Sequence, residues 1–104
     1  MADVFFWKEA EKDYKKLDGG LKQWVDADKE RLEKRGSEIG KSLRNNSYSK
    51  LAGFKELKND KMGVRLIYKP SSEGIIEIIE IVAIGTREEE KVFRTAEKRK
   101  SARE

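Results

Sequence analysis

The spacing of apolar side chains predicts two helices in the first third of the chain. After a short β-prone run at residues 4–7, one helical stripe is formed by Trp7, Ala10, Tyr14 and Leu17. We expect the pair Gly19-Gly20 to end this helix, because glycine disfavours a helix interior. A second stripe follows and is expected to end near Gly36; its members are Leu21, Trp24, Val25 and Leu32. Two helices joined by a short glycine-containing turn predict an antiparallel helical hairpin.

Two alternatives remain open for this region. Ile39 and Leu43 keep the helical period beyond Gly36 and are compatible with a longer second helix. A coiled-coil dimer is the weaker reading, because Asp28 occupies a position in the seam.

Beyond Asn45-Asn46-Ser47 the apolar period changes from helical to alternating. Residues 54–58 form the first predicted strand, and residues 59–63 form its turn. In the next strand, Val64, Leu66 and Tyr68 share one face, and Arg65 lies on the other. Residues 70–74 are a predicted turn. The β-branched run at residues 75–84, apolar on both faces, predicts the central and most buried strand.

The last predicted element is a helix that opens at a capping box, T-x-x-E, made by Thr86 and Glu89. It presents Val92, Phe93 and Ala96 to the core, and residues 98–104 are expected to form a flexible basic tail. The predicted fold class is therefore α+β, in a single domain over residues 1–104. An N-terminal helical hairpin packs on a small antiparallel sheet, with a C-terminal helix.

The chain of 104 residues contains no cysteine and no histidine. The first absence excludes a disulfide framework, a thiolate nucleophile and a thiolate metal site. The second excludes a Ser-His triad and most zinc sites. Acid–base chemistry would fall to lysine, arginine, tyrosine or carboxylates, and we expect no metal and no cofactor.

No segment has the length of a signal-peptide core or of a membrane span. The N-terminal apolar run is short and has no basic flank before it, and Glu77 and Glu80 interrupt the longest apolar stretch. We expect a cytoplasmic protein that does not contact a membrane.

Positive charge is concentrated in the middle of the chain. Residues 50–69 hold six basic residues and two acidic ones, Glu56 and Asp60. The net charge of this segment is therefore +4, the same as that of the whole chain. A basic patch suggests a polyanionic partner. Lysines that only keep a small domain in solution would give the same balance, so charge alone does not distinguish the two.

Arg87 stands immediately after the most apolar strand, at the start of the last helix. A cation at a helix N-terminus is unfavourable because the helix dipole is positive there, and an anion such as phosphate would relieve the conflict. A surface pair with Glu88 or Glu90 would relieve it equally well. The chain has no G-x-x-x-x-G-K-[ST] loop, no G-x-G-x-x-G fingerprint and no acidic cluster with metal-binding spacing.

Taken together, four segments resemble the RelE/ParE superfamily, the toxins of bacterial type II toxin–antitoxin modules. They are Lys50–Lys58, Gly63–Tyr68, Ile84–Arg87 and the pair Val92-Phe93. The resemblance covers nearly the whole chain and implies a RelE-like fold. In the RelE branch it implies a ribosome-dependent, metal-independent endoribonuclease that cleaves translated mRNA and so inhibits translation.

By position, the resemblance assigns catalytic roles to Lys58, Arg65 and Arg87, and to Lys55 only if a small gap is allowed. It assigns RNA binding to Phe93, Lys61, Lys91 and Arg94. The implied reaction is attack by an RNA 2′-hydroxyl on the adjacent phosphate, where two arginines can stabilise the developing negative charge.

Phe93 departs from the family pattern, because RelE-like nucleases often carry at this position a tyrosine that is used in the chemistry. A phenyl ring can stack on a base but cannot move a proton. Base duty would then fall to a lysine whose pKa is lowered by neighbouring cations, or to Glu56.

The resemblance also implies partners: a cognate antitoxin, the ribosome and mRNA. We expect the antitoxin to cover the basic surface or to displace the C-terminal helix, near an exposed neighbourhood of Val92, Phe93 and Ala96. Two other functions remain open, a ParE-like toxin that inhibits DNA gyrase without nuclease activity, and a non-catalytic module that binds RNA or protein.

Overall fold

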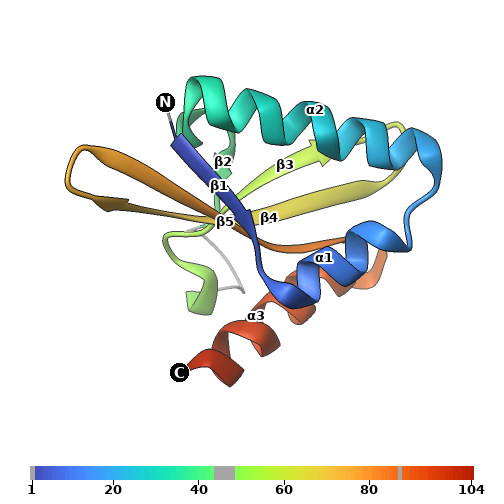
Figure 1. The fold of residues 1–104 in the computed structure, drawn as a ribbon. Helices are drawn as coiled ribbons and strands as arrows, with labels where there is room; N and C mark the ends of the chain where they lie inside the picture. The colour runs from blue at the N-terminus through green and yellow to red at the C-terminus, as the bar shows by residue number, and fades with distance from the viewer. Residues whose placement is uncertain (1, 44–48, 87) are drawn as a thin grey trace.

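The computed structural model describes residues 2–43, 49–86 and 88–104, which form three α-helices and one five-stranded sheet (Figure 1). The strand order is β1-β5-β4-β3-β2. The strands are β1 (Ala2–Phe6), β2 (Lys41–Ser42), β3 (Lys55–Asn59), β4 (Val64–Glu73) and β5 (Ile76–Thr86). The helices are α1 (Lys8–Lys15), α2 (Gly19–Arg35) and α3 (Lys91–Arg103), with short 3-10 turns at Ser37–Ile39, Ser49–Leu51 and Glu88–Glu90.

The sheet is mixed, which corrects the antiparallel sheet predicted from the sequence, although the α+β class is confirmed. Strands β2 to β5 pair antiparallel in succession, whereas β1 lies parallel to β5. Because two helices and three strands separate β1 from β5 along the chain, no tight turn forces this pair to be antiparallel.

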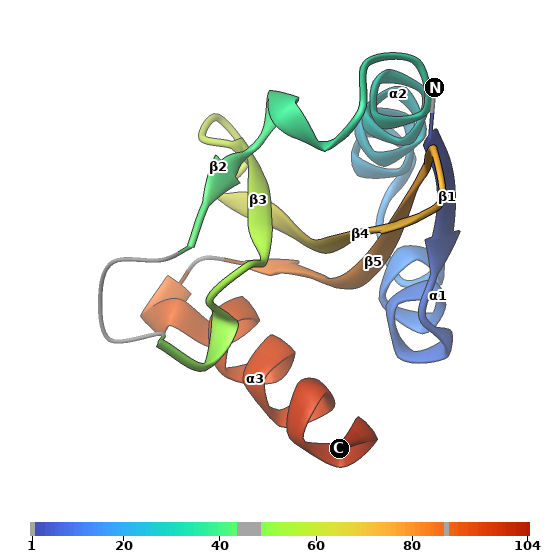
Figure 2. The same cartoon turned by 90° about the vertical axis from the view of Figure 1, so that its left-hand side faces the viewer.

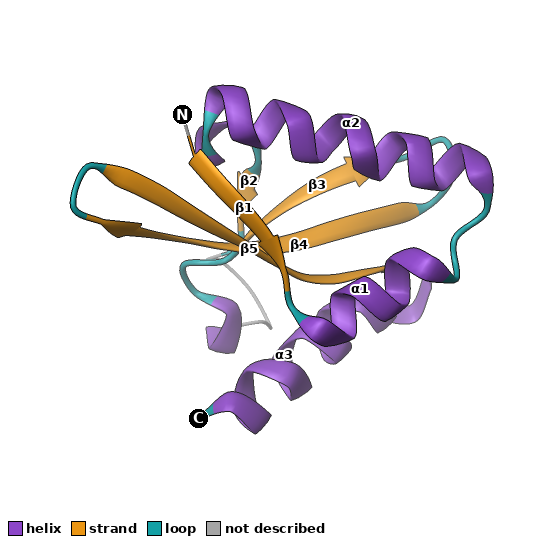
Figure 3. Cartoon of the chain, in the orientation of Figure 1, coloured by secondary structure: helices purple, strands orange, loops and turns teal. Residues whose placement is uncertain are grey.

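The helices cover different parts of the sheet. Helix α2 lies on one side of the sheet and packs mainly against β1, while α3 lies on the opposite side (Figures 1 and 2). Helix α1 packs mainly against β5 and contacts α2 much less. The predicted pair of helices and its short connection are present (Figure 3), but each helix packs chiefly on its own strand rather than on the other helix.

The boundary between α1 and α2 differs from the prediction. The two glycines do not end α1; they are the first two residues of α2, and α1 already ends at Lys15. The carboxylate of Asp18 explains the difference, because it accepts a hydrogen bond of 2.9 Å from the backbone N–H of Leu21 and so caps α2. At the other end α2 stops at Arg35, where Gly36 takes a φ of 82° that glycine adopts without strain.

The turn predicted at residues 70–74 is wrong, because β4 continues to Glu73 and pairs with β5 along its whole length. Pro70 is accommodated because β3 accompanies β4 only as far as Tyr68, which leaves one edge of β4 unpaired beyond it. The hairpin turns at Gly74 and Ile75. The tip is solvated, so Ile75 and Ile76 are exposed, contrary to the expectation that the whole run from residue 75 is buried.

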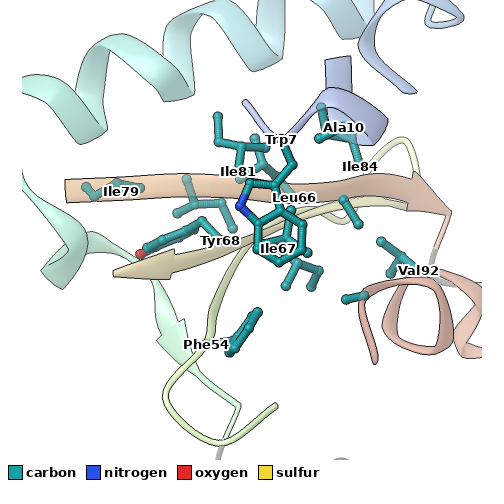
Figure 4. Close-up of a cluster of buried hydrophobic side chains, with 14 of the residues drawn as sticks. Trp7, Ala10, Phe54, Leu66, Ile67, Tyr68, Ile79, Ile81, Ile84 and Val92 are labelled. Carbon is teal, nitrogen blue, oxygen red and sulfur yellow. The ribbon is translucent and has the colours of Figure 1, made fainter. Parts of the chain in front are cut away.

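The rest of that run is largely buried as predicted, since β5 lies between β1 and β4, but the central strand of the five is β4 and not β5. Side chains of β4 and β5 form the centre of the core. Trp7, Ala10, Phe54 and Val92 surround them (Figure 4). The Tyr68 hydroxyl donates a hydrogen bond of 2.6 Å to the carbonyl oxygen of Ser37. Burial raises the pKa of Tyr68 to about 12.

Helix α3 begins later and ends later than predicted. The Thr86 hydroxyl accepts a hydrogen bond of 3.1 Å from the N–H of Glu88, but a 3-10 turn follows and the α-helix starts only at Lys91; the side chain of Glu89, the predicted partner of Thr86, lies outside the described residues. The prediction that Val92, Phe93 and Ala96 enter the core is confirmed, so they do not form the exposed partner surface that we expected.

The residues expected to form a flexible tail are helical through Arg103. Two ion pairs with α1 explain this: Arg99 binds Asp13, and Arg103 binds Glu9 at 3.1 Å. No helix in the described part of the chain is long and apolar enough to cross a membrane.

A buried carboxylate in α2 gives the first stability prediction. Asp28 is 1% exposed, and one of its oxygens has no partner among the described residues. Burial, partly offset by Arg31, raises the pKa of Asp28 from 3.8 to about 6. Since the folded state then holds a proton that the unfolded state has lost, stability falls as pH rises from about 4 to about 6.

We therefore expect Asp28→Asn to raise the free energy of unfolding at pH 8 by on the order of 2 kcal/mol and to leave it nearly unchanged at pH 4. Urea unfolding of both proteins across this range measures the difference directly. An equal difference at both pH values would contradict the assignment.

Gly40 lies so close to Tyr68 and to the backbone of β3 that a side chain at this position would clash. A methyl group on Gly40 would overlap the Tyr68 hydroxyl and would lie 2.8 Å from the carbonyl oxygen of Glu56. We expect Gly40→Ala to cost about 1–3 kcal/mol of stability, the usual cost of overpacking. Gly19→Ala is the matched control, because nothing lies within 4 Å of the added methyl; denaturation midpoints that fall equally in both variants would contradict this.

Candidate functional site

Two of the predicted site residues face each other across neighbouring strands. Lys58 of β3 pairs with Arg65 of β4, and Arg65 pairs in turn with Gly85 of β5. Because side chains directly opposite each other share a face of a sheet, these positions lie on one face. Val92 of α3 packs on Gly85, at 3.6 Å from where a Cβ would stand. We call this the α3 face.

Arg65 is held on the α3 face by two contacts. Its Nη1 donates a hydrogen bond to the carboxylate of Glu56, which lies on the same face two residues before Lys58. Its guanidinium carbon also lies 5.3 Å from the centre of the Phe93 ring, a cation–π contact. The side chain of Arg65 remains 19% exposed, and its Nε is buried with no acceptor among the described residues.

Lys55 lies on the opposite face from Lys58 and Arg65. It pairs with Tyr68, and its ammonium donates a hydrogen bond of 3.0 Å to the carbonyl oxygen of Ser37, just after α2. The reason is the two-residue period of a strand: residues three apart, such as Lys55 and Lys58, point to opposite faces. The structure therefore does not bring Lys55 to the other predicted site residues.

The remaining predicted residues that the structure describes lie in the turn between β3 and β4 and in the first turn of α3. Lys61 is exposed in the turn between β3 and β4, and Lys91 and Arg94 are exposed in the first turn of α3. Phe93 is only 6% exposed beneath Arg65, so a base could stack on it only after the contact with Arg65 rearranges. Arg87 lies outside the described residues.

A cleft lies where α1, the end of β5 and α3 meet. Its volume is about 350 Å³, and α1, the end of β5 and α3 contribute its walls. Lys16 and Lys91 lie at its rim, where both are exposed. In its wall, Arg99 donates to both oxygens of Asp13, at 2.7 and 3.0 Å, and to the carbonyl oxygen of Val82 at 2.8 Å.

Sequence reasoning missed the Asp13–Arg99 pair. Nothing in the local pattern marks it, because 86 residues separate the two partners. No group of three or more acidic residues in the described ranges is arranged to hold a metal ion. Among the described residues, the predicted catalytic residues that share a face are Lys58 and Arg65, and Glu56 and Phe93 contact the Arg65 guanidinium.

Comparison with known proteins is informative at the level of structure. No protein-family model matches the chain, and no curated protein matches it in sequence. Solved structures do match. An arginine-to-alanine double mutant of the E. coli toxin RelE in the free state aligns with a TM-score of 0.71 at 21% identity, over 95% of this chain and 98% of that one.

Two further structures extend the likeness. The RelBE2 toxin–antitoxin complex of Mycobacterium tuberculosis contains a chain that aligns with a TM-score of 0.65 at 24% identity, over 83% of this chain and 98% of that one. A YoeB/ParE toxin from Agrobacterium tumefaciens aligns with a TM-score of 0.62 at 13% identity, over 82% and 98%.

These alignments span almost the full length of each toxin, so the likeness concerns the whole fold rather than one motif. It agrees with the sequence segments that carry the resemblance, which lie on β3, on β4, at the end of β5 and in α3. The chain therefore has the RelE-like fold that its sequence resemblance implies.

Proposed function

We propose that this protein is the toxin of a bacterial type II toxin–antitoxin module and acts as a ribosome-dependent endoribonuclease on translated mRNA. The observation that carries the proposal is the pairing of Lys58 with Arg65 on the α3 face of a RelE-like sheet. Two cations on adjacent strands form a local positive patch, and a phosphodiester is the anion that RNA would present to it.

The chemistry follows from the charge. Attack of a 2′-hydroxyl on the neighbouring phosphate forms a new P–O bond, breaks the bond to the 5′-oxygen and leaves a cyclic phosphate. Negative charge grows on the phosphoryl oxygens meanwhile, and Arg65 can donate hydrogen bonds to them. Lys58 adds a second positive charge, and Arg87, to which the resemblance also assigns a catalytic role, directly follows Thr86 in the sequence.

The Lys58 ammonium is assigned the proton transfer to the departing 5′-oxygen, because Phe93 has no hydroxyl and Glu56 is engaged with Arg65. Solvent water accepts the proton that the 2′-hydroxyl loses. Lys61, Lys91 and Arg94 are exposed at the edges of the α3 face, where they can contact RNA phosphates. The proposed reaction uses no cofactor or metal, because Arg65 and Lys58 supply the positive charge that stabilises the phosphoryl oxygens.

The proposed partners are a cognate antitoxin, the ribosome and mRNA, met in the cytoplasm. The antitoxin proposal draws on the M. tuberculosis toxin–antitoxin complex, whose toxin shares this fold. Because Val92, Phe93 and Ala96 are buried, an antitoxin that uses these residues would first have to displace α3.

Inhibition of DNA gyrase is the second candidate function. It is favoured by Phe93, which lacks a hydroxyl and is buried, and by the fold likeness to a YoeB/ParE toxin. In that case the α3 face would contact protein rather than RNA, and growth arrest would occur without mRNA cleavage.

The first functional prediction concerns Arg65. Primer extension on a cellular mRNA after brief induction of the protein should reveal discrete cuts inside the translated region. Arg65→Ala should lower cleavage by about 10²–10³-fold, the usual loss when a donor to a transition-state anion is removed. Growth arrest without cuts would favour gyrase or another target, and full toxicity of the variant would contradict a catalytic Arg65.

The second functional prediction separates two lysines of one strand. Lys58→Ala should lower cleavage at least tenfold, because it removes a charge beside Arg65. Lys55→Ala should lose about 1 kcal/mol of stability, from its hydrogen bond to Ser37, and keep its cleavage rate. Thermal unfolding combined with the cleavage assay tests both; equal loss of cleavage in the two variants would refute the separation by face.

A further inference from the structure

Among the described residues, Arg65 and Arg99 each form a largely buried ion pair with a carboxylate. Their hydrogen bonds differ strongly. Arg99 makes three hydrogen bonds, to both oxygens of Asp13 and to the carbonyl oxygen of Val82. Arg65 makes one hydrogen bond, from Nη1 to Glu56, and its Nε has no acceptor among the described residues. A guanidinium carries five N–H donors, and within the described residues one donor of Arg65 has an acceptor.

Glu56 is also unusual by its position. It is 5% exposed on the α3 face, and Arg65 is its only recorded partner within the described ranges. A buried carboxylate is costly unless a cation compensates it, and it gives less stability than an apolar side chain of the same size. Replacing a buried ion pair by apolar residues is often neutral or stabilising. Packing alone therefore does not account for a carboxylate at position 56.

We propose that Glu56 is a positioning residue, which fixes the Arg65 guanidinium so that its exposed end is presented to a phosphate of the substrate. The contact at Nη1 holds one corner of the guanidinium, and the Phe93 ring, at 5.3 Å, supports it. With Nη1 engaged and Nε buried, Nη2 remains as the donor that a phosphate oxygen can reach, and the neighbouring Nε–H reports on that contact. This inference rests on the proposed function, because it takes an RNA phosphate as the ligand.

The geometry requires a hydrogen-bond acceptor at position 56, whereas the negative charge of Glu56 works against an incoming anion. Two substitutions separate these properties. Glu56→Gln keeps the reach and the acceptor oxygen but removes the charge, and Glu56→Asp keeps the charge but shortens the side chain by one methylene. A positioning role therefore predicts that the glutamine variant outperforms the aspartate variant.

The test uses inorganic phosphate as the probe and the Nε–H signal of Arg65 in ¹⁵N-labelled protein as the readout. Arg65→Lys identifies this signal by removing it. We expect phosphate to shift the signal saturably in the wild type. Glu56→Gln should bind phosphate at least as tightly, and Glu56→Asp and Glu56→Ala should bind it at least tenfold more weakly.

Ser37→Ala is the matched structural control. It removes a hydrogen bond of 2.6 Å to Glu77, on the other side of the sheet, and changes no charge. It should lower stability without altering the phosphate response. If Glu56→Ala does not fold, the order of the glutamine and aspartate variants still decides the question.

The reverse order, or phosphate affinity in Glu56→Ala within threefold of the wild type, would overturn the proposal. So would a wild-type Nε signal that does not respond to phosphate. Absence of RNA cleavage by a wild type whose Nε signal does respond would overturn the ribonuclease proposal alone, because the phosphate titration needs no turnover.

Discussion

The ion pair between Asp13 and Arg99 is the contact on which the arrangement of the helices depends. Strand β1 leaves β5 after the N–H of Trp7 has bonded to the carbonyl oxygen of Ile81, so the next backbone groups on that edge of β5 lose their strand partner. Arg99 donates to the carbonyl oxygen of Val82, and Asp13 accepts from the N–H of Ile84. Since buried backbone groups must be paired, α1 and α3 are both fastened to β5 at this point.

The candidate site follows from that attachment. With its C-terminal half held by Arg99, α3 lies across the sheet, and its first turn places Val92 on Gly85 and Phe93 under Arg65. The basic residues of the first turn then stand at the border of the α3 face. A helix far from the β3–β4 pair in sequence thereby completes the surroundings of an arginine on β4.

The two faces of the sheet have separate tasks. On the face toward α2, Tyr68 and Lys55 bond to the carbonyl oxygen of Ser37, and Glu77 accepts from the same residue's N–H and hydroxyl, which together hold the segment after α2 against the sheet. On the α3 face, Arg65 bonds to Glu56 but its Nε has no acceptor among the described residues. The period of two along each strand separates the structural cations from the ones available to a ligand.

Sequence periodicity by itself determined the existence and type of the helices and the main strands, and the burial of Val92, Phe93 and Ala96. These are local properties, because side-chain spacing along one element decides which residues share a face. It failed at Gly19-Gly20 and Pro70, where a capping carboxylate and an unpaired strand edge overrode the local preference. Only the tertiary structure decided the parallel pairing of β1 with β5, the Asp13–Arg99 pair and the contact of Glu56 and Phe93 with Arg65. Each of these joins residues distant in sequence, whose proximity depends on how the whole chain packs.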